Sequence, residues 1–329
     1  MILCVSLNPA LDKMLRINKI KPGEVNRARL ESVHAGGKAI NVAFDLKIQG
    51  DDALVTGFIG GKTGKVIVEE LKQRNMPYEF VRLVTETRTN MNYIDDEGKV
   101  TEILEGGHLV DAESEINFIK LYRRLVARAD MVVLSGSLPI GLTDEMYAVL
   151  TDIANEADVP VCLDTSGDAL ETGVKHAPFI IKPNLSEFEN LTKHKYDFTA
   201  LDEGFDEFFE SASFKNVLLP DLLELRDMGI MIICVTLGAK GLLLFARNRL
   251  IVCKAPRVIV ENTVGSGDST LAALIHSLIK KASLEEAAIY SVSVAAAHVT
   301  TMNVGDVDPN LVSKLMKEIK YGTYSLQED

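Results

Sequence analysis

From about residue 110 onward, short apolar runs alternate with helix-like segments, and this alternation leaves few folds open to the chain. The apolar runs lie at 131–134, 159–163, 179–181 and 230–235. Continuous apolar runs of this length are typical of strands that are covered on both faces. Strands that alternate with helices favour right-handed crossovers and a mostly parallel sheet. We therefore predict an α/β fold with a mostly parallel central sheet and helices on both of its faces.

Two segments depart from this rhythm, at about 13–35 and 88–105. Both are strand-like with polar alternation, and the turn Asp-Asp-Glu-Gly at 95–98 makes the second a hairpin. We expect them to form a small β lid outside the main sheet of a single domain spanning 1–329. Because isolated two-stranded ribbons are marginal in water, we also expect a homodimer through the lid. The acidic, aromatic stretch 196–216 has no chemical pattern that we can interpret.

Composition excludes several classes of function. A net charge of −12 argues against general binding to nucleic acid or to anionic membranes. No apolar run approaches the roughly 20 residues that cross a bilayer. The first seven residues are typical of a strand and not of a signal peptide, so we expect a cytoplasmic protein. The four cysteines and six histidines lack metal-ligand spacing, so we predict no zinc-type site.

The strongest functional signal is the glycine-rich turn Asn-Thr-Val-Gly-Ser-Gly-Asp-Ser at 262–269, which opens an apolar helix. Gly265 and Gly267 allow successive backbone N–H groups to converge, and the helix dipole adds positive potential there. A carboxylate at Asp268 inside such an anion cradle is suited to be the base for a substrate hydroxyl. The alternative is a simple helix cap.

A second glycine pair, Gly36-Gly37, stands before an expected helix at 42–49. The side chains of Lys38 and Asn41 would join the helix N-terminus, which suits a sugar hydroxyl or a phosphate. A purely structural loop is the alternative.

Two further turns suit a nucleotide. Lys-Pro-Asn-Leu-Ser-Glu at 182–187 and Thr-Leu-Gly-Ala-Lys-Gly at 236–241 each end a buried strand. Open α/β sheets bind ligands at such carboxyl ends of parallel strands. The polar groups at 182–187 could hold phosphates and, through Glu187, a hydrated Mg²⁺. A plain turn is the alternative for each.

The Gly-Gly-Lys-Thr-Gly sequence at 60–64 resembles the end of a Walker A loop. That motif requires glycine five residues before Gly61, where this chain has Thr56. We predict an ordinary strand-to-helix turn. No G-x-G-x-x-G opens a helix, so a dinucleotide fold has little support.

Taken together, these blocks resemble the PfkB (ribokinase-like) family of sugar kinases over nearly the whole chain. The first family signature matches 36–41 and the second matches 262–268. The other matching blocks are 7–12, 87–89, 135–139, 182–184 and 236–241. Leu-Asn-Pro at 7–9 and Lys38 resemble the branch that acts on hexose monophosphates. Segments 101–105 and 264–270 resemble tagatose-6-phosphate kinase most.

The resemblance implies roles for individual residues on the sugar side. Asp12, Gly37 and Asn41 would hold sugar hydroxyls. Lys38 and Arg88 would grip the phosphate already on the substrate, Arg88 with two parallel bonds.

The resemblance also implies how ATP and Mg²⁺ are held. The nucleotide residues would be Lys182, Asn184, Thr236, Gly238 and Gly241, with Glu187 toward the metal. Asp268 would take the hydroxyl proton while the amides of the turn, at Gly265, Ser266, Gly267 and Asp268, stabilise the transferring phosphoryl group.

The expected reaction is ATP-dependent phosphorylation of a ketohexose monophosphate to the bisphosphate, as in tagatose-6-phosphate kinase. Fructose 1-phosphate and fructose 6-phosphate remain alternative acceptors. Ala39 stands where this branch usually has glycine, which leaves the choice of substrate open. Two rivals are a non-catalytic sugar-phosphate sensor and a kinase for nucleosides or unphosphorylated sugars, which would not need Lys38 and Arg88 together.

Overall fold

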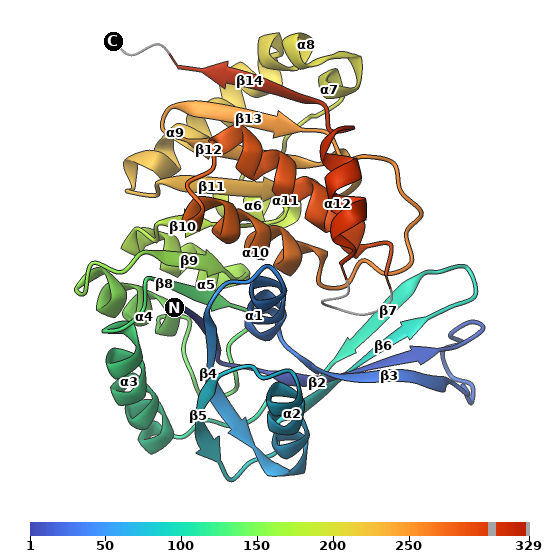
Figure 1. Ribbon diagram of the computed structural model, residues 1–329, viewed down its shortest axis with the longest axis vertical. Coiled ribbons are helices and arrows are strands. Elements are labelled where there is room, and N and C mark those ends of the chain that lie inside the picture. The colour runs from blue at the N-terminus through green and yellow to red at the C-terminus, as the bar shows by residue number, and fades with distance from the viewer. Residues whose placement is uncertain (302–306, 327–329) are drawn as a thin grey trace.

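The large sheet confirms the predicted α/β architecture. We describe residues 1–301 and 307–326 of a computed structural model (Figure 1). Its ten-stranded sheet has the order β14-β13-β12-β11-β10-β9-β8-β1-β4-β5. The strands are β1 Ile2–Ser6, β4 Ala53–Gly60, β5 Tyr78–Leu83, β8 Met131–Ser135, β9 Val161–Asp164, β10 Ile180–Ile181, β11 Ile232–Thr236, β12 Leu242–Ala246, β13 Arg249–Cys253 and β14 Tyr321–Ser325. Neighbours from β5 to β11 pair in parallel, whereas β11 to β14 pair antiparallel.

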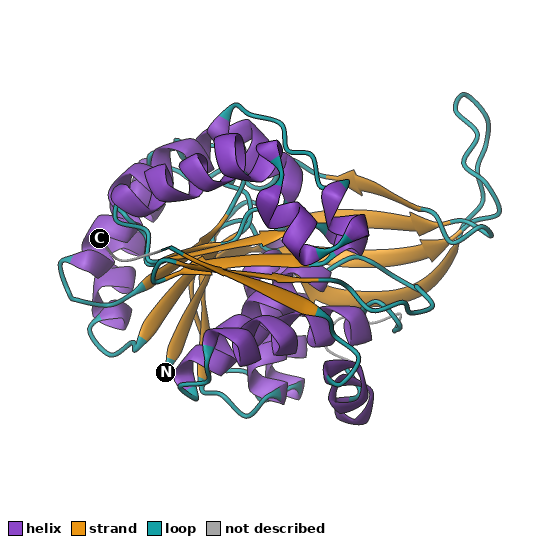
Figure 2. Cartoon of the chain, turned by 90° about the horizontal axis from the view of Figure 1, so that it is seen from above, coloured by secondary structure: helices purple, strands orange, loops and turns teal. Residues whose placement is uncertain are grey.

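Helices cover both faces of this sheet (Figure 2). One core holds Leu3 and Val5 of β1 with side chains from α3 to α6, and the other holds Ile2 and Cys4 with side chains from α1, α2, α10 and α11. A strand buried on both faces needs apolar residues at every position, which explains the unbroken apolar runs. The helices are α1 Lys38–Ile48, α2 Gly61–Gln73, α3 Ala112–Val126, α4 Met146–Asn155, α5 Gly167–Gly173, α6 Leu185–Thr192, α7 Ala200–Glu203, α8 Phe205–Glu210, α9 Leu219–Asp227, α10 Ser266–Ile279, α11 Leu284–His298 and α12 Pro309–Met316.

The predicted lid is a separate four-stranded sheet that extends away from the helical layers (Figure 1). Its order is β3-β2-β6-β7, from strands β2 Ala10–Arg16, β3 Arg29–Gly36, β6 Arg88–Ile94 and β7 Val100–Leu104. The β6–β7 hairpin closes with an amide of Gly98 donating to the carbonyl of Asp95, and Gly98 has a φ of 78°. The segments at 13–35 and 88–105 therefore form the small sheet that the polar alternation predicted.

The stretch at 196–216, which the sequence left without an interpretation, packs its aromatic side chains against the edge of the large sheet. Phe209 and Phe214 lie 5.7 and 5.0 Å from the ring of Tyr324 in β14. Phe208 packs on the same cluster and is 1% exposed. The stretch therefore builds part of the core. None of the helices among the described residues is both long and apolar enough to cross a membrane.

Candidate active site

Predicted site residues and further polar side chains gather where adjacent parallel strands end. β8 ends at Ser135 and β9 at Asp164, and Lys182 directly follows β10. Thr236 is the last residue of β11 and forms a β-bridge with Asn184. Because carboxyl ends of parallel strands lie at one edge of a sheet, these side chains and the glycine-rich turn before α10 can converge.

Asp268 lies in the first turn of α10 and is 5% exposed. The helix begins after Gly265, whose φ of 85° is the left-handed conformation that glycine adopts without strain. Asn41 Nδ2 donates to Asp268 Oδ2 over 2.8 Å. Burial raises the pKa of Asp268 to about 7, with the charge of Lys38 opposing that rise and the charge of Asp164 adding to it. A carboxylate with this pKa can accept a proton at neutral pH.

Two ammonium groups lie beside this turn and share one buried carboxylate. Lys38 Nζ is 3.0 Å and Lys182 Nζ 3.3 Å from Asp164 Oδ1. Lys182 is 3% exposed, and its Nζ would lie 3.4 Å from a Cβ added to Gly267. Lys182 therefore lies against Gly267 of the turn, and Lys38 is held near it by the shared Asp164.

The charges in this cluster support one another. Burial alone would lower the pKa of Lys38, but the carboxylates of Asp164, Asp268 and Glu187 together raise it above its usual range. Burial would likewise raise the pKa of Asp164, yet Lys182 and Lys38 hold it below its usual range. Lys38 and Asp164 are therefore charged, and the cluster places both lysine side chains beside the anion cradle.

Asp164 was not among the residues that the sequence singled out. It is fully buried and ends β9, a strand that the apolar run at 159–163 did predict. A carboxylate placed directly after such a run is the signal that could have found it, because charged residues are rarely buried without a partner.

The helix after Gly36-Gly37 begins earlier than predicted. We expected it at 42–49, but α1 spans Lys38–Ile48, with Gly37 at its N-cap and a φ of 106°. The amides of Ile40 and Asn41 donate to the carbonyl of Gly37. Lys38 and Asn41 thus stand one turn apart on α1, which directs both toward Asp268 and its neighbours.

A second group of polar side chains forms where the lid meets the large sheet. Asn90 Nδ2 donates to Asp12 Oδ1 over 2.8 Å. A Cβ on Gly36 would come within 2.0 Å of Asp12 Oδ2, so only glycine allows this approach. Burial raises the pKa of Asp12 to about 6, although its bond to Asn90 and the charge of Arg88 oppose the rise. Asn90 is a further site candidate that the sequence reasoning missed.

Arg88 begins β6 and is oriented by two backbone carbonyls. Its Nε donates to Asn8 over 3.2 Å and its Nη1 donates to Glu105 over 3.0 Å. These bonds fix the plane of the guanidinium, so a bound phosphate would be met mainly through Nη2. The two parallel bonds expected of Arg88 would require it to release one carbonyl.

The structure assigns Lys38 and Arg88, which the sequence paired, to different clusters. Lys38 interacts with Asp164, Asp268 and Glu187, whereas Arg88 interacts with Asp12 and Glu105. Lys38 therefore lies with the residues around Asp268, and Arg88 lies with those at the base of the lid.

The two predicted nucleotide turns lie side by side. Asn184 and Glu187 form a capping box at the start of α6, each side chain accepting from the other residue's backbone amide. The Thr236 amide donates to the carbonyl of Pro183. Gly238 and Gly241 have φ values of 58° and 116°, and a Cβ on Gly241 would meet the carbonyl oxygen of Cys253 at 1.9 Å. The glycines therefore shape a turn that no other residue would form without strain.

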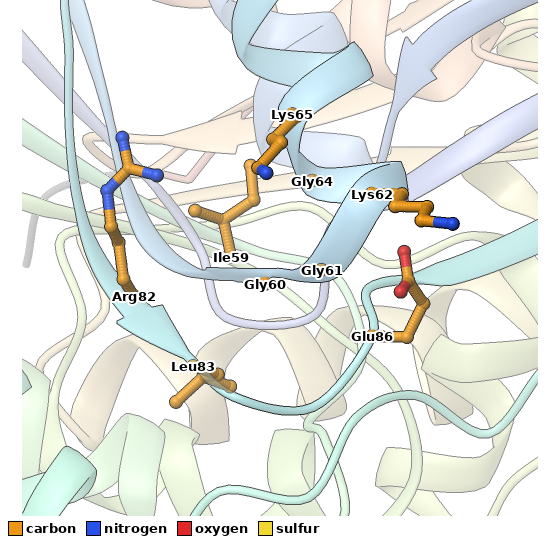
Figure 3. A pocket seen from close by; sticks show the side chains of 9 residues that line it. All are labelled: Ile59, Gly60, Gly61, Lys62, Gly64, Lys65, Arg82, Leu83 and Glu86. Carbon is orange, nitrogen blue, oxygen red and sulfur yellow. The ribbon is translucent and has the colours of Figure 1, made fainter.

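The turn at 60–64, which resembles the end of a Walker A loop in sequence, joins β4 to α2 as an ordinary strand-to-helix connection (Figure 3). A hollow of about 290 Å³ lies beside it. The carboxylate of Glu86 accepts from the backbone amide of Thr63, and this bond holds the pKa of Glu86 below its usual range. The chain's own carboxylate thus occupies the position that a phosphate would take in a P-loop.

Comparison with known proteins agrees with this geometry. The family model for pfkB family carbohydrate kinases matches residues 5–311. Phosphofructokinase-2 from Escherichia coli, in its tetrameric inhibited form, is 24% identical with a TM-score of 0.83, over 96% of this chain and 98% of that one. A Thermotoga maritima protein described as a possible 1-phosphofructokinase is 25% identical with a TM-score of 0.82, over 99% and 100%.

Proposed function

Because the chain belongs to the pfkB family of carbohydrate kinases, we propose that it transfers the γ-phosphate of ATP to a ketohexose monophosphate, giving the bisphosphate. The observation that carries the proposal is Asp268, a buried carboxylate at a helix N-terminus with Lys38 and Lys182 beside it. We propose tagatose 6-phosphate as the first acceptor to test. The alternatives are fructose 1-phosphate and fructose 6-phosphate, the sugar with which E. coli phosphofructokinase-2 has been solved.

In this reaction Asp268 accepts the proton of the attacking sugar hydroxyl. The hydroxyl oxygen forms a bond to the γ-phosphorus as the bond from that phosphorus to the β-phosphate oxygen breaks, and ADP leaves. Asn41 holds one oxygen of Asp268, which leaves the other free for the sugar. A positioned base of this kind contributes about 10²–10⁴ in rate.

Two features of the protein would stabilise negative charge on the transferring phosphoryl group. The amides of Gly265, Gly267 and Asp268 lie at the start of α10, and the helix dipole adds to them. The Ser266 amide, which we also expected to contribute, donates to the carbonyl of Thr263. The ammonium groups of Lys38 and Lys182 stand on the same side as Gly267. Such preorganised charge commonly contributes more to the rate of phosphoryl transfer than any other feature of the site.

The turns at 182–187 and 236–241 are proposed to hold ATP. Mg²⁺ prefers a few carboxylate oxygens together with waters and phosphate oxygens over a cage of protein ligands. Glu187 fits this preference, because it is half-buried and its charge reaches Lys38. Bound Mg²⁺ would neutralise charge on the β- and γ-phosphates.

Arg88 is proposed to recognise the phosphate already on the acceptor. It lies at the base of the lid beside Asp12 and Asn90, which suit sugar hydroxyls. A phosphate on the acceptor would give this half-buried guanidinium, which already interacts with Asp12 and Glu105, a further anion to bind. This favours a sugar phosphate over a nucleoside or an unphosphorylated sugar as acceptor. A non-catalytic sensor would have no need for a base of raised pKa inside an anion cradle.

The test is ADP release measured with each of the three sugar phosphates and with fructose, ribose and a nucleoside. We expect kcat/KM to be highest for one sugar phosphate. Arg88→Ala should raise KM for that sugar far more than KM for ATP, and Lys99→Ala, an exposed change in the β6–β7 turn, should alter neither. Equal effects of Arg88→Ala on both substrates would contradict the assignment of Arg88. Turnover of unphosphorylated sugars alone would contradict the acceptor class.

We also propose a homodimer through the lid. Leu30 of β3 and Leu104 of β7 lie on the two edge strands and are 54% and 55% exposed. Burying such side chains against a second copy removes apolar surface from water. Light scattering at working concentration should give the mass of a dimer, and a monomer would contradict the proposal.

A further inference from the structure

A buried chain of hydrogen bonds begins one residue after Asp268. Ser269 Oγ lies 2.5 Å from Asp45 Oδ2 and 2.8 Å from His298 Nδ1. The other ring nitrogen, His298 Nε2, lies 2.8 Å from the carbonyl oxygen of Val264. Asp45, Ser269 and His298 are 2%, 0% and 1% exposed. These hydrogen bonds therefore connect three helices, α1, α10 and α11, to the turn that carries the anion cradle.

The geometry of these hydrogen bonds determines how many protons the linked side chains hold. A carbonyl oxygen only accepts, so His298 Nε2 must carry a hydrogen. Each of the two contacts of Ser269 Oγ also needs a hydrogen between its atoms, and the hydroxyl supplies one. The other must come from His298 Nδ1 or from a protonated Asp45. Asp45 and His298 thus share one proton and are together neutral in either arrangement.

The electrostatic surroundings agree with a shared proton. Burial raises the pKa of Asp45, while Ser269, the charge of His298 and the charge of Arg74 oppose that rise. An ionised Asp45 beside a neutral His298 would leave the hydroxyl one hydrogen short. A hydrogen-bond acceptor would then be left unpaired in the core, which is unfavourable.

The same end of α11 holds the turn at a second place. The backbone amides of Glu261 and Asn262 both donate to the carbonyl of Val299, which directly follows His298. His298 binds the carbonyl of Val264, immediately before the N-cap Gly265. Between these contacts the turn has little freedom to move, so the positions of the Gly265 to Asp268 amides depend on the C-terminal end of α11.

We propose that Asp45, Ser269 and His298 are positioning residues for phosphoryl transfer. Through Val264 they hold the anion cradle in the geometry that the transition state requires, and the one proton they share keeps every link bonded. The inference rests on the proposed function of the cradle. None of the three side chains has to touch a substrate.

The decisive comparison is Ser269→Ala against Ser277→Ala. Both serines are buried on α10, but among the described residues the hydroxyl of Ser277 bonds only to the Ala273 carbonyl of its own helix. We expect Ser269→Ala to lower kcat about 10- to 100-fold with KM for both substrates within about twofold, because a misplaced cradle weakens transition-state binding. Ser277→Ala should keep the wild-type kcat. A kcat for Ser269→Ala within about twofold of Ser277→Ala would overturn the proposal.

Two more variants test the links and the proton count. His298→Gln should lower kcat as much as Ser269→Ala does. The double variant should lower kcat no further than either single variant, because each single change already breaks the same chain of hydrogen bonds. This keeps the proposal testable if Ser269→Ala does not fold. Asp45→Asn is neutral and its amide can donate to Ser269, so kcat should stay within about threefold of wild type. A loss as large as that of Ser269→Ala would overturn the shared-proton arrangement.

A readout independent of turnover separates this inference from the proposed function. In ¹⁵N-histidine NMR of the intact protein, the resonances lost in His298→Gln identify His298. We expect its Nε2 to be protonated in wild type and in Asp45→Asn. An unprotonated Nε2 would overturn the link to Val264 even in an active enzyme, whereas a protein with no ADP release and a protonated Nε2 would contradict only the proposed function.

Discussion

Two glycine-rich turns of this chain open helices in the same way and differ in what surrounds them. At 60–64 the amides at the start of α2 bind the exposed carboxylate of Glu86 (Figure 3). At 264–268 the amides at the start of α10 lie beside Lys38 and Lys182, which share the buried Asp164. Lys62 and Lys65 near the first turn are exposed on its rim.

The difference shows that any helix N-terminus can bind an anion, and that the neighbouring charged side chains decide which anion it binds. At the first turn, the carboxylate of Glu86 accepts from the backbone amide of Thr63. The second turn keeps its positive potential because a fully buried counter-charge holds two ammonium groups beside it. Both turns contain glycines and open a helix, and the charged groups that distinguish them come largely from residues distant in the chain.

The largest effect expected from this contrast is on turnover. Asp268→Asn should lower kcat by about 10²–10⁴-fold, because it removes the base and leaves the cradle intact. ATP binding, measured by calorimetry, should change little. The matched change at the other turn, Glu86→Gln, should leave kcat within about twofold. Turnover of Asp268→Asn within about tenfold of wild type would remove Asp268 from the role of base.

Removing the buried counter-charge should affect folding as well as catalysis. Asp164→Asn leaves two ammonium groups without their shared partner, one of them in the core. The free energy of unfolding in urea should fall by about 3–5 kcal/mol. Glu79→Gln, which breaks a surface pair with Arg124 and Arg128, should cost about 0–1 kcal/mol. Equal losses in the two variants would show that Asp164 does not organise the cations.

The dependence of kcat/KM on pH tests whether the pKa of Asp268 at the second turn is raised. Below a pKa of about 7 Asp268 binds a proton and can no longer accept one from the sugar. We therefore expect kcat/KM to fall about tenfold for each pH unit below that value and to level off above it. The binding constant for ATP, measured over the same range, controls for titration of the nucleotide. A profile that stays level down to pH 5 would contradict the raised pKa.

The smallest effect should come from removing the carboxylate charge at the first turn. Glu86→Gln keeps the amide contacts but removes the charge that pairs with the start of α2, so Tm should fall slightly. Glu97→Gln in the exposed β6–β7 turn is a matched surface control. A kcat for Glu86→Gln far below that of the control would mean that the 60–64 turn takes part in the reaction.

Much of the site could be predicted because its residues follow a local rule. Asp268, Lys182 and Thr236 each stand at a strand end or helix start, and such positions are visible as a change from apolar runs to polar residues. Asp164 followed the same rule and was missed because one carboxylate after a strand is common. Asn90 is part of the polar alternation of the lid, which does not single it out. The substrate and metal roles of these residues remain predictions.

By itself the sequence determined most of the alternation of strands and helices, the lid, the family and the turns proposed to carry the chemistry. These follow from hydrophobic periodicity and glycine placement, which act over a few residues. Only the tertiary structure decided that Lys38 faces Asp164 and not Arg88, that Glu86 binds the first turn, and that His298 binds the second. Each of these contacts joins residues more than twenty positions apart, and the pairing of distant charges and hydrogen bonds depends on how the packed elements bring them together.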